Sequence, residues 1–135
     1  MRVYFAVKFR EDMSNRTDVE SVLSVLEKAG CETVCFVRDV EKWGQSCFEA
    51  HELMSMAFKE IDTSDAVIID LTEKGVGLGI EAGYAYARNK QIITIARAGS
   101  DISTTLRGIS KHVLQYKNIG DLAQQISTIM GKCEG

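Results

Sequence analysis

The chain has 135 residues, 45% hydrophobic and 26% charged, which suits a single folded domain over residues 1–135 with a substantial core. Its net charge of −3 argues against a protein that binds nucleic-acid polymers, because such proteins usually present a basic surface. The sequence shows neither a signal peptide nor the roughly 20 consecutive apolar residues of a membrane span, so we expect a cytoplasmic protein that does not enter membranes.

Strand-like and helix-like segments alternate along the whole chain. Short runs rich in β-branched and aromatic residues predict strands, and apolar residues three or four positions apart predict helices. Residues 66–71 form the clearest strand, because the continuous apolar run AVII is typical of a strand buried on both faces. In chain order we expect a strand over residues 2–7, a helix over 18–29, a strand over 32–37, a charged loop over 38–45, a helix over 47–61 and a strand over 66–71. A glycine-rich loop follows, and then a helix over 81–89, a strand over 91–96, a loop with a short helix over 96–110, a strand over 112–115 and a helix over 121–130.

This alternation predicts an α/β fold with a five-stranded parallel sheet and helices on both faces. Ligands of such folds bind at the carboxyl ends of the strands, near a switch in strand order. Three predicted loops with unusual residues leave those ends, at residues 8–16, 72–81 and 98–108. We therefore expect the functional site among these loops.

Residues 75–84, GVGLGIEAGY, place glycines at alternate positions before a single carboxylate, Glu81. We expect Glu81 in the first helical turn, where the helix dipole favours a carboxylate by about 0.3–1 kcal/mol and keeps it ionised as a nucleophile. Gly75, Gly77 and Gly79 would let backbone N–H groups approach a sugar or phosphate. Asp70 ends the preceding strand, and two carboxylates flanking one pocket suit cleavage of a glycosidic bond.

Two other interpretations of this segment remain open. Glu81 can be an ordinary negative charge at a helix start, without any chemical role. The spacing of Gly77, Gly79 and Ala82 also fits the G-x-G-x-x-A fingerprint of dinucleotide-binding proteins. That fingerprint normally follows the first strand, whereas here it follows the third.

Residues 65–95, DAVIIDLTEKGVGLGIEAGYAYARNKQIITI, resemble the nucleoside 2-deoxyribosyltransferase-like superfamily. The shared pattern is a buried strand that begins with Asp, a glycine loop, E-x-G-Y-A and a lysine before the next strand. The 2′-deoxynucleoside 5′-phosphate N-hydrolases are the branch most similar to it. Two further segments support that branch, namely YFAVKFR at residues 4–10 and STTLRG at residues 103–108.

The resemblance implies a flavodoxin-like (Rossmann-like) three-layer fold, usually as a homodimer. It implies an enzyme that acts on a small nucleoside or nucleotide and cleaves its N-glycosidic bond, by hydrolysis or by transfer of the sugar to another base. No metal is expected, because the carboxylates meet the positive charge that develops at the sugar carbon. Glu81 matches the nucleophile. Tyr4 and Arg10 match residues that line the nucleotide pocket, and Ser103 matches a serine that contacts phosphate, in some cases across a dimer interface.

The chain departs from the family pattern at three places. The family usually has a catalytic aspartate where counting back from Asp65 places Ala57. Val7 and Lys8 replace a Gly-Ser pair, and Gly75 replaces a phosphate-loop serine. Lys8 offsets these losses in part, because its ammonium group can hold a phosphate as a point charge. An alternative function is therefore a nucleotide-binding or sensor module without catalysis, and a further one is an interaction domain that uses the fold as a scaffold.

Four other side chains are candidates, and three of them have two open interpretations. Tyr84 is one helical turn beyond Glu81 and can orient it, or it can serve packing in the core or a dimer. Trp43 can stack on a base as a lid, or cover the core. Arg107 can clamp a phosphate or lie on the surface, whereas Arg16 is expected to be a solvated charge.

The cysteine and histidine pattern argues against a metal site. The chain has four cysteines without a C-x-x-C pair, and only two histidines to complete a ligand set. We expect reduced, mostly buried thiols and neither a metal nor a cofactor. The cysteines are Cys31, Cys35, Cys47 and Cys133.

Overall fold

The computed structural model describes the backbone of residues 1–134 and the side chains of residues 1–130. Five parallel strands form one sheet in the order β2-β1-β3-β4-β5, so the predicted five-stranded parallel sheet is confirmed. This order is the flavodoxin-like one. The strands are β1 (Arg2–Val7), β2 (Glu32–Cys35), β3 (Ala66–Asp70), β4 (Gln91–Arg97) and β5 (His112–Tyr116).

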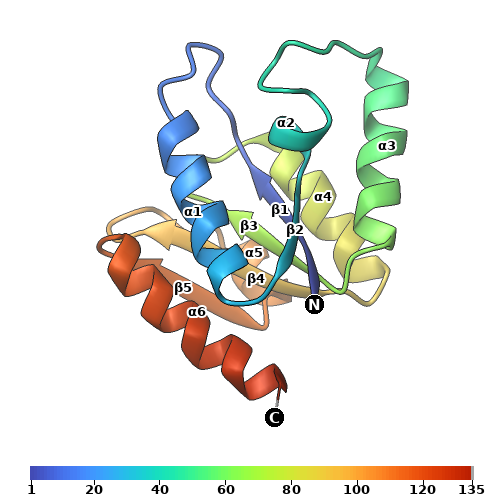
Figure 1. Cartoon of the computed structure of the whole chain (residues 1–135). Helices are drawn as coiled ribbons and strands as arrows, with labels where there is room; N and C mark the ends of the chain where they lie inside the picture. The colour runs from blue at the N-terminus through green and yellow to red at the C-terminus, as the bar shows by residue number, and fades with distance from the viewer. Residues whose placement is uncertain (135) are drawn as a thin grey trace.

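Helices cover both faces of the sheet, as predicted, and make three layers (Figure 1). Two helices lie on one face and three on the other, and a single helical turn follows β2. No helix in residues 1–134 has the length and apolar character needed to span a membrane. The first face carries α1 (Arg16–Lys28) and α6 (Ile119–Glu134), the second carries α3 (Ala50–Asp62), α4 (Val76–Ala87) and α5 (Thr104–Ile109), and the single turn is α2 (Phe36–Asp39).

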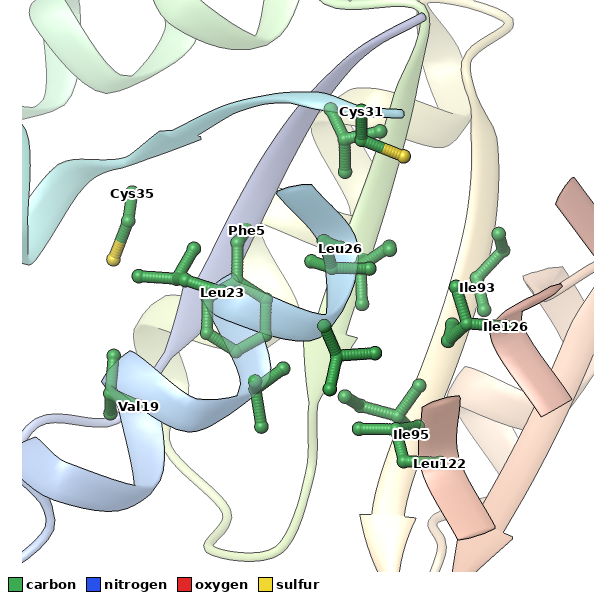
Figure 2. Packing of buried hydrophobic residues seen from close by; sticks show 14 of the residues in the cluster. Phe5, Val19, Leu23, Leu26, Cys31, Cys35, Ile93, Ile95, Leu122 and Ile126 are labelled. Carbon is green, nitrogen blue, oxygen red and sulfur yellow. The ribbon is translucent and has the colours of Figure 1, made fainter. Parts of the chain in front are cut away.

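Each strand sends alternate side chains to opposite faces of the sheet. On β1, Phe5 points toward α1 and packs near Leu23 and Leu26 (Figure 2). Its neighbour Tyr4 belongs to the other apolar cluster, which α3 and α4 cover. Strand β3 is buried along its whole length, as its apolar run predicts. Because fully burying one such side chain stabilises the fold by roughly 1.5–3 kcal/mol, the two clusters hold the layers together.

Helix α4 begins at Val76, so the predicted glycine loop before Glu81 is wrong. Gly75 is the N-cap residue, and Gly77 and Gly79 are helical. The buried residues of α4, namely Leu78, Ala82 and Ala85, recur at helical spacing and pack against the sheet. Their burial outweighs the cost of glycine in a helix, which is roughly 1 kcal/mol per residue at interior positions.

Strand β2 is also shorter than predicted and ends at Cys35. Residues 36–39 turn into α2, because an Asp39 carboxylate oxygen accepts a hydrogen bond from the Cys35 N–H at 2.9 Å and closes the turn. The other element ends differ by a few residues from the prediction. Cys31 and Cys35 are buried and Cys47 is exposed, while the side chain of Cys133 lies outside the described residues.

The strand order reverses direction between β1 and β3, because the chain places β2 on one side of β1 and then returns to place β3 on the other. In α/β sheets this reversal opens a crevice at the carboxyl ends of the strands. The loops over residues 8–15 and 40–49 both lie at that edge of the sheet, at the top of Figure 1. The fold therefore brings residues from β1, α2, α3 and α4 to one site.

Candidate active site

A small pocket of about 100 Å³, here called the inner pocket, lies between β1, α3 and α4. Most of its wall is apolar and comes from side chains such as Phe36, Leu53 and Ala57. Two carboxyl groups, those of Glu81 and Glu41, enter this wall together with the hydroxyl group of Tyr4. An apolar pocket with a few convergent polar groups is typical of a ligand or active site.

Glu81 lies in the second turn of α4 and is half-buried. The pKa of Glu81 is raised from 4.5 to about 7, mainly by burial; a hydrogen bond from Tyr4 opposes the rise, and the negative charge of Glu41 adds to it. The prediction that Glu81 sits in the first turn, ionised by the helix dipole, is therefore wrong. Its carboxyl group is instead poised to gain or lose a proton near neutral pH, as is common for catalytic groups.

Tyr4 is the partner of Glu81 on the strand side of the pocket. Its ring is 1% exposed, and burial raises its pKa, as do the charge of Glu81 and the hydrogen bond between the two groups. Tyr4 therefore remains a neutral phenol, whose hydroxyl group is the hydrogen-bond donor toward the Glu81 carboxylate in this interaction. The structure thus brings together Tyr4 and Glu81, which lie far apart in the sequence.

The three glycines before Glu81 have different surroundings. A Cβ atom on Gly77 would lie 3.9 Å from Glu81 Oε1, so the bare backbone of Gly77 faces the carboxylate. A Cβ atom on Gly75 would lie 3.4 Å from Lys8 Cδ, so the Lys8 side chain crosses the N-cap of α4. Gly79 is exposed, and a Cβ atom there would meet nothing within 4 Å among the described residues.

Asp70 does not share the pocket of Glu81. It lines a separate cavity of about 70 Å³ on the α1 side, where Arg97 and Tyr116 also lie. One Asp70 carboxylate oxygen accepts a hydrogen bond from the Thr72 N–H at 3.0 Å, and burial raises the pKa of the group. The predicted arrangement of two carboxylates, Asp70 and Glu81, around one pocket is thus wrong, because their side chains belong to opposite faces of the sheet.

Arg10 also lies on the Asp70 side. Its guanidinium group forms an ion pair with Glu73, with Nε 2.7 Å from the carboxylate, and donates to the Ser14 hydroxyl group at 3.2 Å. Together with Lys8 it lines the cavity that holds Asp70. Arg10 therefore does not reach the inner pocket.

Tyr84 packs between α3 and α4 rather than orienting Glu81. Its hydroxyl group donates to the Asp62 carboxylate at 2.8 Å, and its ring stacks on Phe58 with centroids 4.2 Å apart. The Arg88 guanidinium group pairs with the same carboxylate at 2.9 Å. These contacts agree with the packing interpretation of Tyr84.

Ser103 and Arg107 belong to α5, outside the inner pocket. Ser103 is the N-cap residue, and its hydroxyl group accepts a hydrogen bond from the Leu106 N–H at 3.4 Å. Arg107 is exposed in the last turn of the same helix. Within one chain, the predicted phosphate contact of Ser103 is therefore not assembled beside Glu81.

A wider cavity of about 590 Å³, here called the outer compartment, adjoins the inner pocket. Val7, Val37 and Glu41 line both. The outer wall carries Trp43, whose ring lies 5.3 Å from that of Phe9 and beneath the Arg16 guanidinium group at 4.5 Å. Arg16 is thus held against an aromatic ring rather than fully solvated. A groove of about 620 Å³ between α1 and α6 is larger, but it lies away from Glu81.

Glu41 is the site residue that the sequence did not reveal. It lies in the charged segment RDVEKWGQ, where its carboxylate resembles an ordinary surface charge. The pattern contains no local signal that distinguishes it from Asp39, which instead closes the α2 turn. Among the described side chains, no group of three or more His, Cys, Asp and Glu residues is placed to hold a metal ion.

Comparisons with known proteins agree with this architecture. The profile of the family described as nucleoside 2-deoxyribosyltransferase matches residues 3–121. A protein of Thermofilum pendens, provisionally named a 2′-deoxynucleoside 5′-phosphate N-hydrolase, is 23% identical over 96% of this chain and 95% of its own.

Two solved structures share the fold at low identity. The CMP N-glycosidase of Clostridium botulinum superposes with a TM-score of 0.68 at 20% identity, covering 96% of this chain and 99% of that one. The 2-deoxyribosyltransferase of Bacillus psychrosaccharolyticus superposes with a TM-score of 0.70 at 16% identity, covering 96% of both chains.

Proposed function

The chain belongs to the nucleoside 2-deoxyribosyltransferase family, and the proteins it matches support an activity of the nucleoside glycosidase or deoxyribosyltransferase type; we propose that Glu81 is its nucleophile. The substrate is a nucleoside or nucleoside 5′-monophosphate, whose N-glycosidic bond is cleaved. The observation that carries this proposal is the half-buried Glu81 carboxyl group, which faces Tyr4 inside an apolar pocket.

In this mechanism the Glu81 carboxylate attacks the anomeric carbon of the sugar as the bond to the base breaks. Positive charge develops on the sugar at that moment, and the nearby carboxylate stabilises it. Tyr4 donates a hydrogen bond that fixes the carboxylate and keeps its pKa from rising further. Water then releases the sugar from Glu81, or a second base accepts it.

The proposed place of a 5′-phosphate is the N-terminus of α4. The Lys8 side chain crosses Gly75 there, and the first turn of α4 contains no acidic residue. Free N–H groups at a helix N-terminus bind phosphate, and an ammonium group adds attraction. Because Glu81 lies one turn further along the same helix, a sugar bridging the two positions would present its anomeric carbon to the carboxylate.

We further propose a homodimer formed through the outer face of α4. Val76, Ile80 and Tyr86 are exposed large hydrophobic residues, and all three lie on this helix. A helix that is apolar on nearly all sides is normally buried on more than one face. A second subunit on this face is also the proposed source of the Ser103 contact, which one chain does not bring to the pocket.

The test is to incubate the protein with ribo- and deoxyribonucleosides and their 5′-monophosphates and to measure free base by chromatography. Base release that disappears in Glu81→Gln, with an unchanged far-UV circular dichroism spectrum, would support the proposal. Release that persists in Glu81→Gln would contradict the nucleophile. Thermal stabilisation by a nucleotide without any base release would favour the binding or sensor module instead.

A further inference from the structure

Given the proposed glycosidase function, we infer that Glu41 is a second catalytic residue, the acid that protonates the leaving base. Glu41 lines the same pocket as Glu81 and Ala57 and lies where the two connected cavities meet. The segment around it otherwise has the character of a surface loop.

Glu41 lies where the glycosidic bond of a bound substrate is expected. Glu41 lines both the inner pocket and the outer compartment, whereas Glu81 lines the inner pocket. A sugar placed against Glu81 leaves its base in the outer compartment, whose wall includes Phe9 and the edge of the buried Trp43, 9% exposed. The bond between sugar and base then passes the Glu41 carboxyl group. A general acid must be within hydrogen-bond reach of the leaving group, and the junction of the two cavities is where the bond to that group would lie.

Ala57 explains why a second acid is needed and why there is room for one. Its methyl group is 3% exposed and lines the inner pocket on the α3 side. It occupies the position at which the family resemblance expects a carboxylate. The absent side chain leaves space on that wall, and Glu41 supplies a carboxyl group to the same pocket from the segment after α2.

The backbone around Glu41 is held in a defined and strained conformation. Its N–H donates to the Phe36 carbonyl at 3.0 Å, and its own carbonyl accepts hydrogen bonds from Gly44 at 3.0 Å and Ser46 at 2.9 Å. The next two residues, Lys42 and Trp43, have positive φ angles of 51° and 58°. Such conformations cost free energy and concentrate at functional sites. Trp43, which lies between Phe9 and Arg16, anchors the segment.

The surroundings of Glu41 and Glu81 favour the protonated form of each carboxyl group. Burial raises the pKa of both Glu41 and Glu81, and the charge of Glu41 raises that of Glu81 further. The other titratable groups facing these cavities are Tyr4 and Cys35 in the inner pocket and Glu11 in the outer compartment. None of these lining groups is a cation, and the positive charge placed beside the outer wall is that of Arg16 over Trp43. Burial therefore favours the protonated form of each carboxyl group.

The reaction balances with water as the only co-reactant. In the first step the bond between the anomeric carbon and the base breaks, its electron pair and the Glu41 proton go to the base, and a Glu81 oxygen bonds to the anomeric carbon. In the second step water attacks that carbon, the Glu41 carboxylate takes a proton from the water, and the bond to Glu81 breaks. The products are free base and sugar, and both carboxyl groups return to their initial state.

The decisive test compares two leaving groups in Glu41→Gln. One substrate is the nucleotide that the wild type cleaves, and the other is the same sugar phosphate with fluoride in place of the base, which needs little proton assistance to leave. We expect kcat to fall about 100-fold or more for the nucleotide and less than about threefold for the fluoride. The high-pH limb of the wild-type rate profile should disappear as well. Glu49→Gln, an exposed carboxylate outside both cavities, is the matched control.

Equal losses of kcat on both substrates would mean that Glu41 only supports the structure. No loss of kcat on either substrate would exclude any role for Glu41. Either result overturns the inference and leaves Glu81 as the nucleophile. A second variant distinguishes the chemical role of Glu41 from an effect on folding. Glu41→Gln combined with Ala57→Asp returns a carboxyl group to the same pocket, and partial recovery of nucleotide cleavage is expected. If the wild type releases no base from any compound, the proposed glycosidase function is wrong. The role of Glu41 as the acid is then wrong as well.

Discussion

The Glu81 carboxylate rests against the bare backbone of Gly77, with Oε1 3.9 Å from where a Cβ atom would lie. That distance is an ordinary contact, so Gly77→Ala should fold and should retain most of its turnover. Gly77→Leu places a branched side chain over the carboxylate, and we expect kcat/KM to fall about 100-fold. Base release and thermal unfolding of the two variants check this; equal activity of both would show that substrate does not approach Glu81 past Gly77.

Glu81 should lower the stability of the protein at neutral and alkaline pH. Because its pKa is raised from 4.5 to about 7, the folded protein holds a proton that the unfolded chain has lost, and stability falls as pH rises between these values. The difference corresponds to about 3 kcal/mol. We expect Glu81→Gln to be more stable than the wild type at pH 8, by up to that amount, and to match it at pH 4. Urea unfolding at the two pH values is the measurement, and an equal difference at both would contradict it.

Tyr4→Phe should move the pH dependence of catalysis. The Tyr4 hydrogen bond lowers the pKa of Glu81, so its loss raises that pKa and shifts the acid limb of the rate profile to higher pH. Tyr84→Phe is the matched control, because its hydroxyl group contacts Asp62 instead. It should cost about 1 kcal/mol of stability and leave the profile in place. If the acid limb of Tyr4→Phe stays at its wild-type pH, Tyr4 has no influence on the pKa of Glu81 during catalysis.

Lys8→Ala should weaken the recognition of a 5′-phosphate. The Lys8 side chain crosses the N-cap of α4, and a hydrogen bond between charged groups contributes roughly 1.5–3 kcal/mol. We expect KM for the 5′-monophosphate to rise about 10- to 100-fold with a smaller change in kcat. The corresponding nucleoside, which has no phosphate, is the internal control and should be unaffected. The same loss on both substrates would place the phosphate elsewhere.

Ile80→Lys should separate the proposed dimer. The substitution puts a charge in the middle of the exposed apolar face of α4, where Val76 and Tyr86 also lie. We expect the sedimenting mass to fall from that of two chains to that of one. Gln124→Lys, on the exposed part of α6, adds the same charge elsewhere and should change nothing. A wild type that sediments as one chain would exclude the dimer directly.

Much of the fold follows from local patterns in the sequence. The strand over residues 2–7 has the predicted bounds, and the apolar run over residues 66–71 correctly predicts a strand covered on both faces. The alternation of strands and helices then leaves few arrangements other than a parallel sheet. These predictions succeed because burial and hydrogen bonding within each element agree with its intrinsic preferences.

The site was harder to predict, because its parts depend on contacts between distant elements. Glycine spacing argues against a helix over residues 76–80, and packing of Leu78, Ala82 and Ala85 on the sheet reverses that preference. Strand β3 is apolar on both faces, so its sequence does not show to which side Asp70 points. Glu41 reaches the pocket because of a left-handed turn over residues 42–44, and the two non-glycine residues there carry no signal for that conformation.

The anchoring of Trp43 gives the protein a built-in optical reporter. Trp43 is the only tryptophan in the chain, so indole emission arises from a single position. That position lies on the wall of the outer compartment, against Phe9 and beneath Arg16. A ligand that enters the compartment changes the polarity around the indole ring and displaces or compresses the Arg16 contact. Occupancy of the site can therefore be followed by intrinsic fluorescence, without a label and without turnover, in catalytically inactive variants as well as in the wild type.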